Sequence, residues 1–362
     1  MIKYTCTLKG HTIIAQAFGR YATEVIMTNN NNAASYTAGF SKGMSENLST
    51  QETVTSFLNF DLRSLSVESS KNYSFPITYT LFYLGTKRIM NLLEKKVKEG
   101  YCKFKLKCGH NYKHDMNMIK RISDTFGKSI DLALDVNHAL TLPNAIRLLE
   151  FAKQHDVAMV EEPCLNQTFS DIAEIRRISG LSIMLDESVK NITDLEQAIE
   201  NNAIDILNIK LGRIGGLEKL QPILSCCRKY DIPIYFGHSG ELSTGIIYSI
   251  LAAITAIENY GLTIKGFELV PPYEMYLFDI NDIRQYINNG NIQMSLNDVE
   301  KEQHADIETL LKKEHICYSK NGMSGMKYKI SNTLQSIAYK ALTLLWLIEP
   351  IVVNRHNPRR GR

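Results

Sequence analysis

Three short apolar runs in this sequence end in a carboxylate at nearly equal intervals. Asp135, Glu161 and Asp186 close these runs and are separated by 26 and 25 residues. A lysine ends the neighbouring run on each side, Lys107 lying 28 residues before Asp135 and Lys210 lying 24 residues after Asp186. A strand, a helix and their loops take up about that length. The spacing therefore predicts five side chains on one rim of a parallel barrel or sheet, and the carboxyl rim is where barrel enzymes carry out catalysis.

A simpler explanation is available for each of these residues alone, because loops are polar and any strand tends to end in a polar residue. Five such residues in one phase make that explanation weaker than a shared site.

From Phe75 onward the pattern alternates between strand and helix. Amphipathic helices such as 87–99, 144–155, 194–201 and 217–229 separate the apolar runs. Repeated right-handed crossovers of this kind close into a barrel, so the expected fold class is α/β. The predicted strands are 77–83, 102–107, 130–135, 158–162, 182–186, 204–210, 233–237 and 264–270.

The two ends of the chain follow other patterns. Residues 1–74 alternate weakly, like antiparallel strands, and are expected to form a small α+β domain in which Asn29 to Asn32 is a solvated loop tip. The barrel is expected over residues 75–285. Residues 286–362 are expected to be a helical segment that packs on the cap or barrel, with 291–316 charged and partly helical. The apolar run 341–353 is too short to span a bilayer and is expected to be a helix docked against the barrel.

Composition limits the kinds of partner. The 362 residues carry 41 basic and 38 acidic side chains, a net charge of +3, which favours neither nucleic acid nor a membrane surface. The seven cysteines form no Cys-x-x-Cys motif, which argues against a disulfide framework or a zinc site. The first residues lack the apolar core of a signal peptide, so a cytoplasmic location is expected.

The three carboxylates offer only oxygen ligands, which suit Mg²⁺, with Mn²⁺ as an alternative, bound in a partly hydrated site open to a substrate carboxylate. Such an ion can stabilise an enolate formed when a base takes a proton from the neighbouring carbon. Lys105 and Lys107 share one face of a strand, and their repulsion is expected to lower the pKa of one of them. Lys210 lies across the barrel mouth, so two lysines can reach opposite faces of one carbon.

Taken together, the ordered motifs resemble the enolase superfamily, in its muconate lactonizing enzyme subgroup, over about residues 75–282. The motifs are Lys105-x-Lys107, Asp135-x-Asn137, Glu161-Glu162-Pro163, Asp186-Glu187-Ser188, and Lys210 followed by Gly215-Gly216. The resemblance implies a capping domain on a modified (β/α)7β barrel, and it is compatible with a homo-oligomer.

The same resemblance assigns roles to individual residues. It implies that Asp135, Glu161 and Asp186 bind Mg²⁺. Lys107 and Lys210 would be the acid/base pair, and Lys105 would tune Lys107. Asn137 and Glu187 would be hydrogen-bond partners of the metal site.

The resemblance implies a small carboxylate as substrate, but the motifs leave its identity open. The run 208–217 resembles o-succinylbenzoate synthases and N-acylamino acid racemases, whereas Gly266-Phe-Glu268-Leu resembles muconate cycloisomerases. Dipeptide epimerases usually carry Asp-x-Asp where this chain has only Glu268. Cycloisomerisation is the first expectation, with racemisation or epimerisation of an acylated amino acid or dipeptide and o-succinylbenzoate synthesis as alternatives.

Three further residues are candidates for substrate contact: His238, Glu241 and Glu268. His238 would be a base of the mandelate racemase kind only if an Asp replaced Lys210, so a substrate hydrogen bond or a structural role is favoured for it. Glu241 also fits a helix start for electrostatic reasons alone, and Arg213 fits a salt bridge below the rim.

The capping region departs from the family pattern, because the lysine pair begins several dozen residues earlier than usual. A shortened cap leaves a second hypothesis from a different class, a catalytically weak barrel that serves as a binding protein.

Overall fold

A computed structural model describes the strands at 2–8, 11–18, 22–29 and 32–38, and residues 68–303 with gaps at 83–84, 110, 166–167, 215–216, 239–242 and 270–281. The structural statements below concern these residues. The predicted helix at 341–353 lies outside them.

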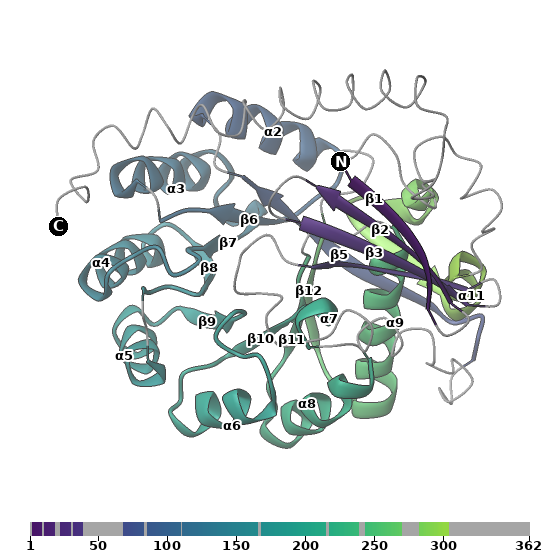
Figure 1. Ribbon diagram of the computed structural model, residues 1–362. Coiled ribbons are helices and arrows are strands. Elements are labelled where there is room, and N and C mark those ends of the chain that lie inside the picture. The colour runs from purple at the N-terminus through teal and green to yellow at the C-terminus, as the bar shows by residue number, and fades with distance from the viewer. Residues whose placement is uncertain are drawn as a thin grey trace.

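A closed barrel of eight parallel strands forms the centre of the molecule (Figure 1). The last strand pairs with the first, Phe267 opposite Ile77 and Glu268 opposite Thr78, and this pairing closes the sheet. All eight strands predicted from the sequence are confirmed, most of them to within two residues at their ends. They are β5 (Asn72–Leu81), β6 (Lys103–Lys107), β7 (Asp131–Asp135), β8 (Val157–Glu161), β9 (Ser182–Leu185), β10 (Ile206–Ile209), β11 (Ile234–Phe236) and β12 (Ile264–Glu268).

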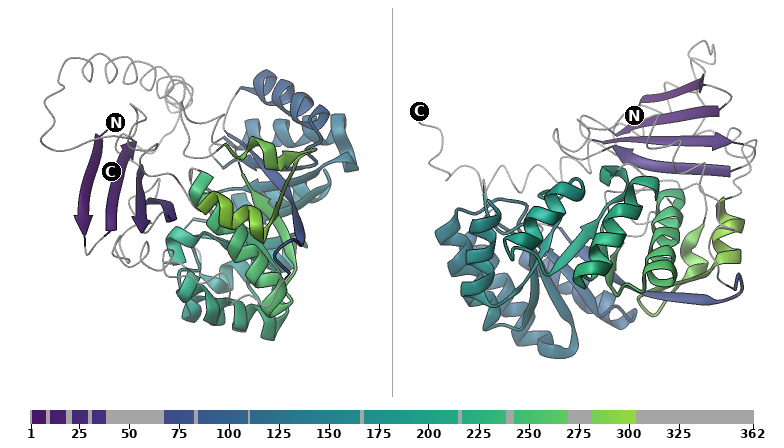
Figure 2. Two further views of the ribbon diagram at one scale, coloured as in Figure 1. Left: turned by 90° about the vertical axis from the view of Figure 1, so that its right-hand side faces the viewer. Right: turned by 90° about the horizontal axis from the view of Figure 1, so that it is seen from below.

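Helices cover the outside of this barrel (Figures 1 and 2). Each crossover between consecutive barrel strands contains at least one helix, which confirms the predicted (β/α)7β order. The helices are α2 (Thr86–Lys98), α3 (Tyr112–Phe126), α4 (Leu142–Lys153), α5 (Phe169–Ser179), α6 (Ile192–Glu200), α7 (Leu211–Ile214), α8 (Leu217–Tyr230) and α9 (Ser243–Tyr260). A short 3₁₀ turn, η2 (Gly127–Ser129), follows α3.

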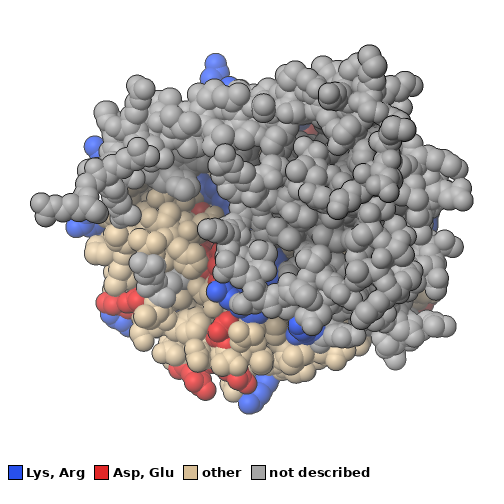
Figure 3. Space-filling view, viewed as in Figure 1, with Lys and Arg blue, Asp and Glu red and all other residues tan. Residues whose placement is uncertain are grey.

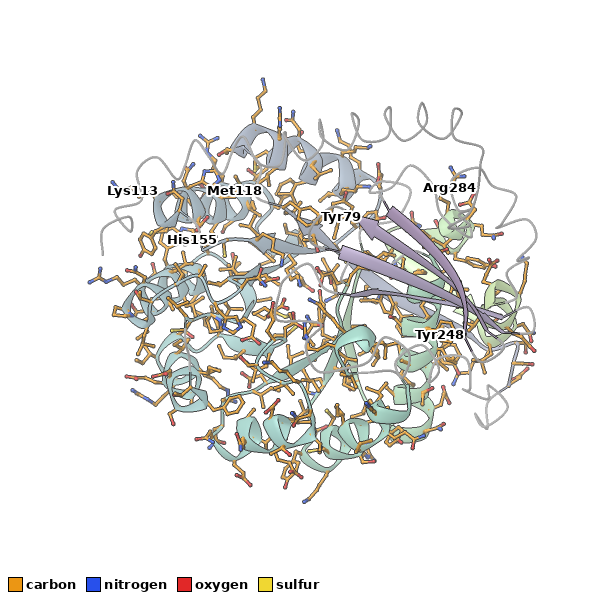
Figure 4. The ribbon with its side chains drawn as sticks, in the orientation of Figure 1. Tyr79, Lys113, Met118, His155, Tyr248 and Arg284 are labelled. Carbon is orange, nitrogen blue, oxygen red and sulfur yellow. The ribbon has the colours of Figure 1, made fainter. Side chains whose placement is uncertain are left out.

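Helical periodicity explains how these helices dock. In α4 the buried residues Ala145, Leu148, Leu149 and Ala152 recur at intervals of three and four, which places them on one face. Met118 on α3 and Tyr248 on α9, both labelled in Figure 4, belong to the same buried core between helices and strands. None of the described helices combines the length and apolarity needed to cross a bilayer.

The C-terminal part of the described chain extends the barrel sheet. After η3 (Ile283–Tyr286) come β13 (Ile287–Asn288), β14 (Asn291–Ser295) and α11 (Leu296–Gln303). The segment 291–316 was expected to be partly helical, and α11 is a helix within it. Its first residues form the strand β14, which pairs antiparallel with the first half of β5, Ile292 opposite Phe75. The alternation of Ile292 and Met294 buried with Gln293 exposed is that of a half-covered strand.

Four N-terminal strands form a separate antiparallel sheet in sequential order (Figure 2). They are β1 (Ile2–Leu8), β2 (His11–Phe18), β3 (Ala22–Asn29) and β4 (Asn32–Ala38). Asn29, at the end of β3, pairs with Asn32, at the start of β4, and residues 30 and 31 of the expected loop tip lie outside the described residues. The domain limits at residues 74 and 285 remain predictions.

Candidate active site at the carboxyl rim of the barrel

The barrel interior is layered. Met159, Met184, Ile206 and Tyr235 pack together inside it, one from each of four neighbouring strands. Side chains two positions further along a strand point to the same face. The next layer toward the carboxyl rim therefore contains Glu161, Asp186, Asn208 and Gly237, a polar set above an apolar floor.

Lys107 lies at one side of this rim. Its Nζ donates to Asp135 Oδ2 at 2.5 Å and to Asn137 Oδ1 at 2.8 Å. The Asn137 amide also donates from Nδ2 to Glu187 Oε1 at 3.0 Å, which links the loop after β7 to the loop after β9. The structure thus brings both residues expected to support the metal site into one network with the lysine.

Lys105 is fully buried between three carboxylates. Its Nζ lies 2.7 Å from Glu161 Oε2, 2.6 Å from Glu268 Oε2 and 3.4 Å from Asp135 Oδ2. Burial acts to lower the pKa of the ammonium, but the nearby carboxylates outweigh it and raise the pKa well above its ordinary value. The expected lowering by repulsion between lysines is therefore wrong for Lys105, because the barrel brings acids from β8 and β12 to it.

Lys210 and Arg213 both bind Asp186. The Lys210 Nζ donates to Asp186 Oδ2 at 2.7 Å, and Arg213, on α7, donates to the other carboxylate oxygen. Burial alone would raise the pKa of Asp186, but the two cations hold it below its usual range. Burial likewise acts to lower the pKa of Lys210, and Asp186 reverses that effect and raises it. Arg213 forms a buried salt bridge, as expected from the sequence, but with Asp186 at the rim and not below it.

Glu162 fixes the loop that carries Asp186. It accepts hydrogen bonds from the backbone N–H of Asp186 at 2.7 Å and of Ser188 at 2.8 Å, and from the Ser188 hydroxyl at 2.7 Å. No role was predicted for Glu162 from the sequence. The Glu161-Glu162 pair was the available signal. Successive residues of a strand point to opposite faces, so only one of the two can point into the barrel and the other needs a separate role.

Backbone strain gathers at the same rim. Asn137, His138 and Glu162 have φ angles of 43°, 57° and 43°, the left-handed region that side chains other than glycine rarely adopt. Strain of this kind persists where the surrounding contacts overdetermine the conformation, which is common at functional sites.

A second group of atoms able to coordinate a metal ion lies beside the predicted metal ligands. His138, Glu162 and Glu187 each offer an atom within 4.8 Å of the others. The His138 Nδ1 lies 3.2 Å from the carbonyl oxygen of Cys164, which can only accept, so Nδ1 carries the proton. Its Nε2 faces Glu162 at 3.4 Å and Glu187 at 3.9 Å. His138 was not singled out from the sequence.

The chemistry of the donor set fits a divalent cation at Asp135, Glu161 and Asp186. Among the described residues the rim holds six carboxylates, those three with Glu162, Glu187 and Glu268, against the four cationic groups of Lys105, Lys107, Lys210 and Arg213. The formal excess of negative charge matches one Mg²⁺, and oxygen donors are the ligands it prefers.

Burial, together with neighbouring carboxylates, shifts the pKa values of three of these acids. Burial first, and then Asp186, raise the pKa of Glu187 to about 7, and burial raises that of Glu162 to about 7. Burial and the nearby Asp135 likewise raise the pKa of Glu161. On the face seen in Figure 3, acidic and basic atoms alternate on the described surface without a continuous basic patch.

The residues expected to contact substrate have different surroundings. Glu268 points into the barrel, where it accepts from Lys105 and, at 2.5 Å, from the Thr80 hydroxyl. The backbone N–H of His238 lies 3.4 Å from Glu268 Oε2, and the His238 side chain is half-buried. Glu241 lies outside the described residues.

Comparison with known proteins identifies the family. A family model described as enolase C-terminal domain-like matches residues 88–296, more than half of the chain. The chain belongs to this family. The enolase C-terminal domain-like match confirms the superfamily predicted from the lysine and carboxylate motifs, and with it an enzyme family whose members bear isomerase and lyase names.

Two curated relatives illustrate the range of those names. The chain is 30% identical over 174 residues to the o-succinylbenzoate synthase of Geobacillus kaustophilus, covering 48% of this chain and 45% of that protein. It is 27% identical over 178 residues to the L-Ala-D/L-Glu epimerase of Francisella tularensis subsp. novicida, covering 49% of each. The chain thus matches about half the length of these relatives.

A solved structure extends the likeness of the fold. The muconate lactonizing enzyme from Pseudomonas putida superposes with a TM-score of 0.64, covering 80% of this chain and 94% of that one, at 17% sequence identity. At that identity the similarity establishes the enolase-type barrel and not the reaction.

Proposed function

We propose that this protein removes the proton from the carbon next to a substrate carboxylate, and returns a proton to it, in a Mg²⁺-dependent reaction through an enolate. The observation that carries the proposal is the placement of Lys107 and Lys210. They end strands β6 and β10, four apart in a barrel of eight, so they face each other across its mouth. Each contacts one of the carboxylates expected to bind the metal.

Asp135, Glu161 and Asp186 would hold Mg²⁺, which supplies positive charge to the substrate carboxylate as the enolate forms. Lys107, with 27% of its side chain exposed, reaches the mouth where substrate enters. Lys210 is more enclosed, with 8% exposed. A base must be neutral before it accepts a proton, and a carboxylate engaged by a divalent cation attracts the neighbouring ammonium less strongly.

Two bases on opposite sides of one carbon favour racemisation or epimerisation as the overall reaction. One lysine takes the proton from one face and the other returns a proton to the opposite face, which inverts the centre. The similarity to an epimerase agrees with this choice. Cycloisomerisation, expected first from the Gly266-Phe-Glu268 run, needs a proton on one face only and is the second candidate.

The test is incorporation of deuterium from D2O into a panel of N-succinyl and N-acetyl amino acids of both configurations, L-Ala-L-Glu and cis,cis-muconate. Mass spectrometry follows deuterium uptake and chiral chromatography follows inversion, with Mg²⁺ or with a chelator. We expect Mg²⁺-dependent exchange with inversion in an acylated amino acid or the dipeptide. Ring closure of muconate without inversion elsewhere would favour the cycloisomerase, and exchange retained in chelator would contradict the metal assignment.

Lys107→Ala should lower the exchange rate by about a thousandfold, the size expected for loss of a general base. Lys103→Ala is the matched control, because Lys103 lies on the same strand but pairs with Asp131 at its opposite end, at 2.7 Å. Unchanged exchange in Lys107→Ala would remove Lys107 as the base. Silence across the panel from folded protein that binds Mg²⁺ would favour the binding-protein hypothesis.

A further inference from the structure

The side-chain amide of Asn208 has a hydrogen-bond partner for its NH2 group but, within the described part of the chain, no hydrogen-bond donor for its carbonyl oxygen. Only 2% of the residue is exposed. Its Nδ2 donates to Glu161 Oε1 at 2.7 Å, and this contact fixes the amide orientation, because the flipped amide would set an oxygen against a carboxylate. Among the described residues no donor reaches its Oδ1. Burying an acceptor without a hydrogen-bond donor costs free energy. This suggests that a donor reaches Oδ1 when the site binds its metal.

Gly237 leaves room for such a partner beside Asn208. It follows β11 next to the end of β10, where its N–H donates to the carbonyl of Ile209 at 2.9 Å. A Cβ at this position would lie 2.7 Å from Lys210 Cε and would overlap the amide of Asn208. The absence of a side chain at Gly237 therefore lets Lys210 and Asn208 occupy neighbouring space.

Lys210 needs a second acceptor if Asp186 is a metal ligand. Its ammonium donates a hydrogen bond to Asp186 Oδ2. A metal cation bound to Asp186 would compete for the same oxygen. A buried ammonium that loses its carboxylate is expensive unless another acceptor takes its place. The Nζ is one bond beyond the Cε atom that already borders the space at Gly237.

We propose that Asn208 is a positioning residue for Lys210, its Oδ1 accepting the lysine ammonium when Asp186 turns to the metal. Gly237 provides the space for this second position. The inference rests on the proposed function and deepens it: Asn208 ties the ligand Glu161 to the lysine through the two ends of one amide. Asn208 itself takes no proton.

A calorimetric double-mutant cycle tests the proposal without relying on turnover. In Asn208→Leu the ammonium has no second acceptor and stays on Asp186, so Mg²⁺ binding should weaken by about 10- to 100-fold. In a Lys210→Met background no ammonium competes, and the same Asn208→Leu change should weaken binding by less than about threefold. Equal weakening in both backgrounds would show that Asn208 only supports Glu161 and would overturn the proposal.

Exchange in D2O gives a second readout. Lys107→Ala and Lys210→Ala first identify which enantiomer each lysine serves. With Mg²⁺ raised to saturate each variant, Asn208→Leu should then slow exchange of the enantiomer served by Lys210 by about 10- to 100-fold, leaving the other within about threefold. Equal loss for both enantiomers would overturn the proposal. Asn144→Leu, an exposed change on α4, is the control, and circular dichroism checks folding.

The experiments distinguish failure of the proposed function from failure of the role proposed for Asn208. If the wild type exchanges no substrate but the calorimetric cycle behaves as described, the proposed function fails and the role of Asn208 stands. If the wild type binds no Mg²⁺, both fail.

Discussion

Glu162 is the residue whose contacts most directly hold the proposed metal ligand Asp186 in place. Its carboxylate binds two backbone N–H groups and one hydroxyl of the loop that carries Asp186. Glu162→Ala leaves those buried donors unpaired and should weaken Mg²⁺ binding by about 10- to 100-fold.

The matched variant is Glu162→Gln, which keeps an acceptor of the same shape for the two N–H groups. It should stay within about fivefold of the wild type in the same calorimetric titration, since a neutral amide oxygen still accepts. If Gln weakened binding as strongly as Ala, the charge of Glu162 would matter more than its hydrogen bonds, and direct contact with the cation beside His138 would be favoured.

The environment of individual side chains is where the sequence was least informative. Lys105 and Lys107 were correctly placed on one face of one strand. The sequence could not show that Glu161 and Glu268, 56 and 163 residues away, would lie on either side of Lys105. Those contacts depend on barrel closure, and they reverse the predicted direction of the Lys105 pKa.

The loop between β6 and α3 is the element that positions Lys107 from its carboxyl side. Gly109 has φ of 101°, and a Cβ there would lie 2.7 Å from the Cβ of Ala139. The buried carboxylate of Asp115, in the first turn of α3, accepts from the Gly109 N–H at 2.8 Å. Helix and loop are thus joined directly after the lysine.

Gly109→Ala should lower the free energy of unfolding by about 3 kcal/mol, combining a strained φ with overpacking. Gly180→Ala is the control, because Gly180 also has positive φ, 61°, but nothing within 4 Å of a Cβ. It should lose only about 1 kcal/mol in urea unfolding. Equal losses would mean that the collision with Ala139 is relieved by movement of the loop.

Strands and helices were predicted best where two independent sequence signals indicated the same boundary. The run ending at Asp135 is an apolar strand followed by Pro143 in the first turn of α4, and strand and helix were both found there. β14 was missed because its five residues are too few to separate the two periodicities, and its partner is the half of β5 that projects beyond the barrel.

At the scale of the whole molecule, the negative excess at the rim predicts how pH and metal are linked. Glu162 and Glu187 have pKa values raised to about 7, so both are largely protonated at pH 5.5 and largely ionised at pH 8.5. Mg²⁺ binding should therefore release protons near pH 7, and affinity should rise from pH 5.5 to 8.5. Titration calorimetry in two buffers of different ionisation enthalpy measures that release.

The raised pKa values of Glu162 and Glu187 also determine whether folding stability rises or falls with pH. A carboxyl group with a raised folded-state pKa stabilises the fold below its unfolded pKa, and this contribution is lost as pH rises through about 7. The Tm without Mg²⁺ should fall between pH 5 and 8, and Mg²⁺ should raise it more at pH 8 than at pH 6. A metal-free Tm independent of pH in this window would contradict the charge balance drawn for the rim.

Every other assignment in the site depends on the position proposed for the divalent cation, so direct observation of that cation is the decisive measurement. Crystals grown with Mn²⁺ and measured for anomalous scattering should show a peak bounded by Asp135, Glu161 and Asp186, with the Lys210 ammonium withdrawn from Asp186. A peak at His138, Glu162 and Glu187 instead, or none at saturating Mn²⁺, would contradict the metal centre and the proton transfer built on it.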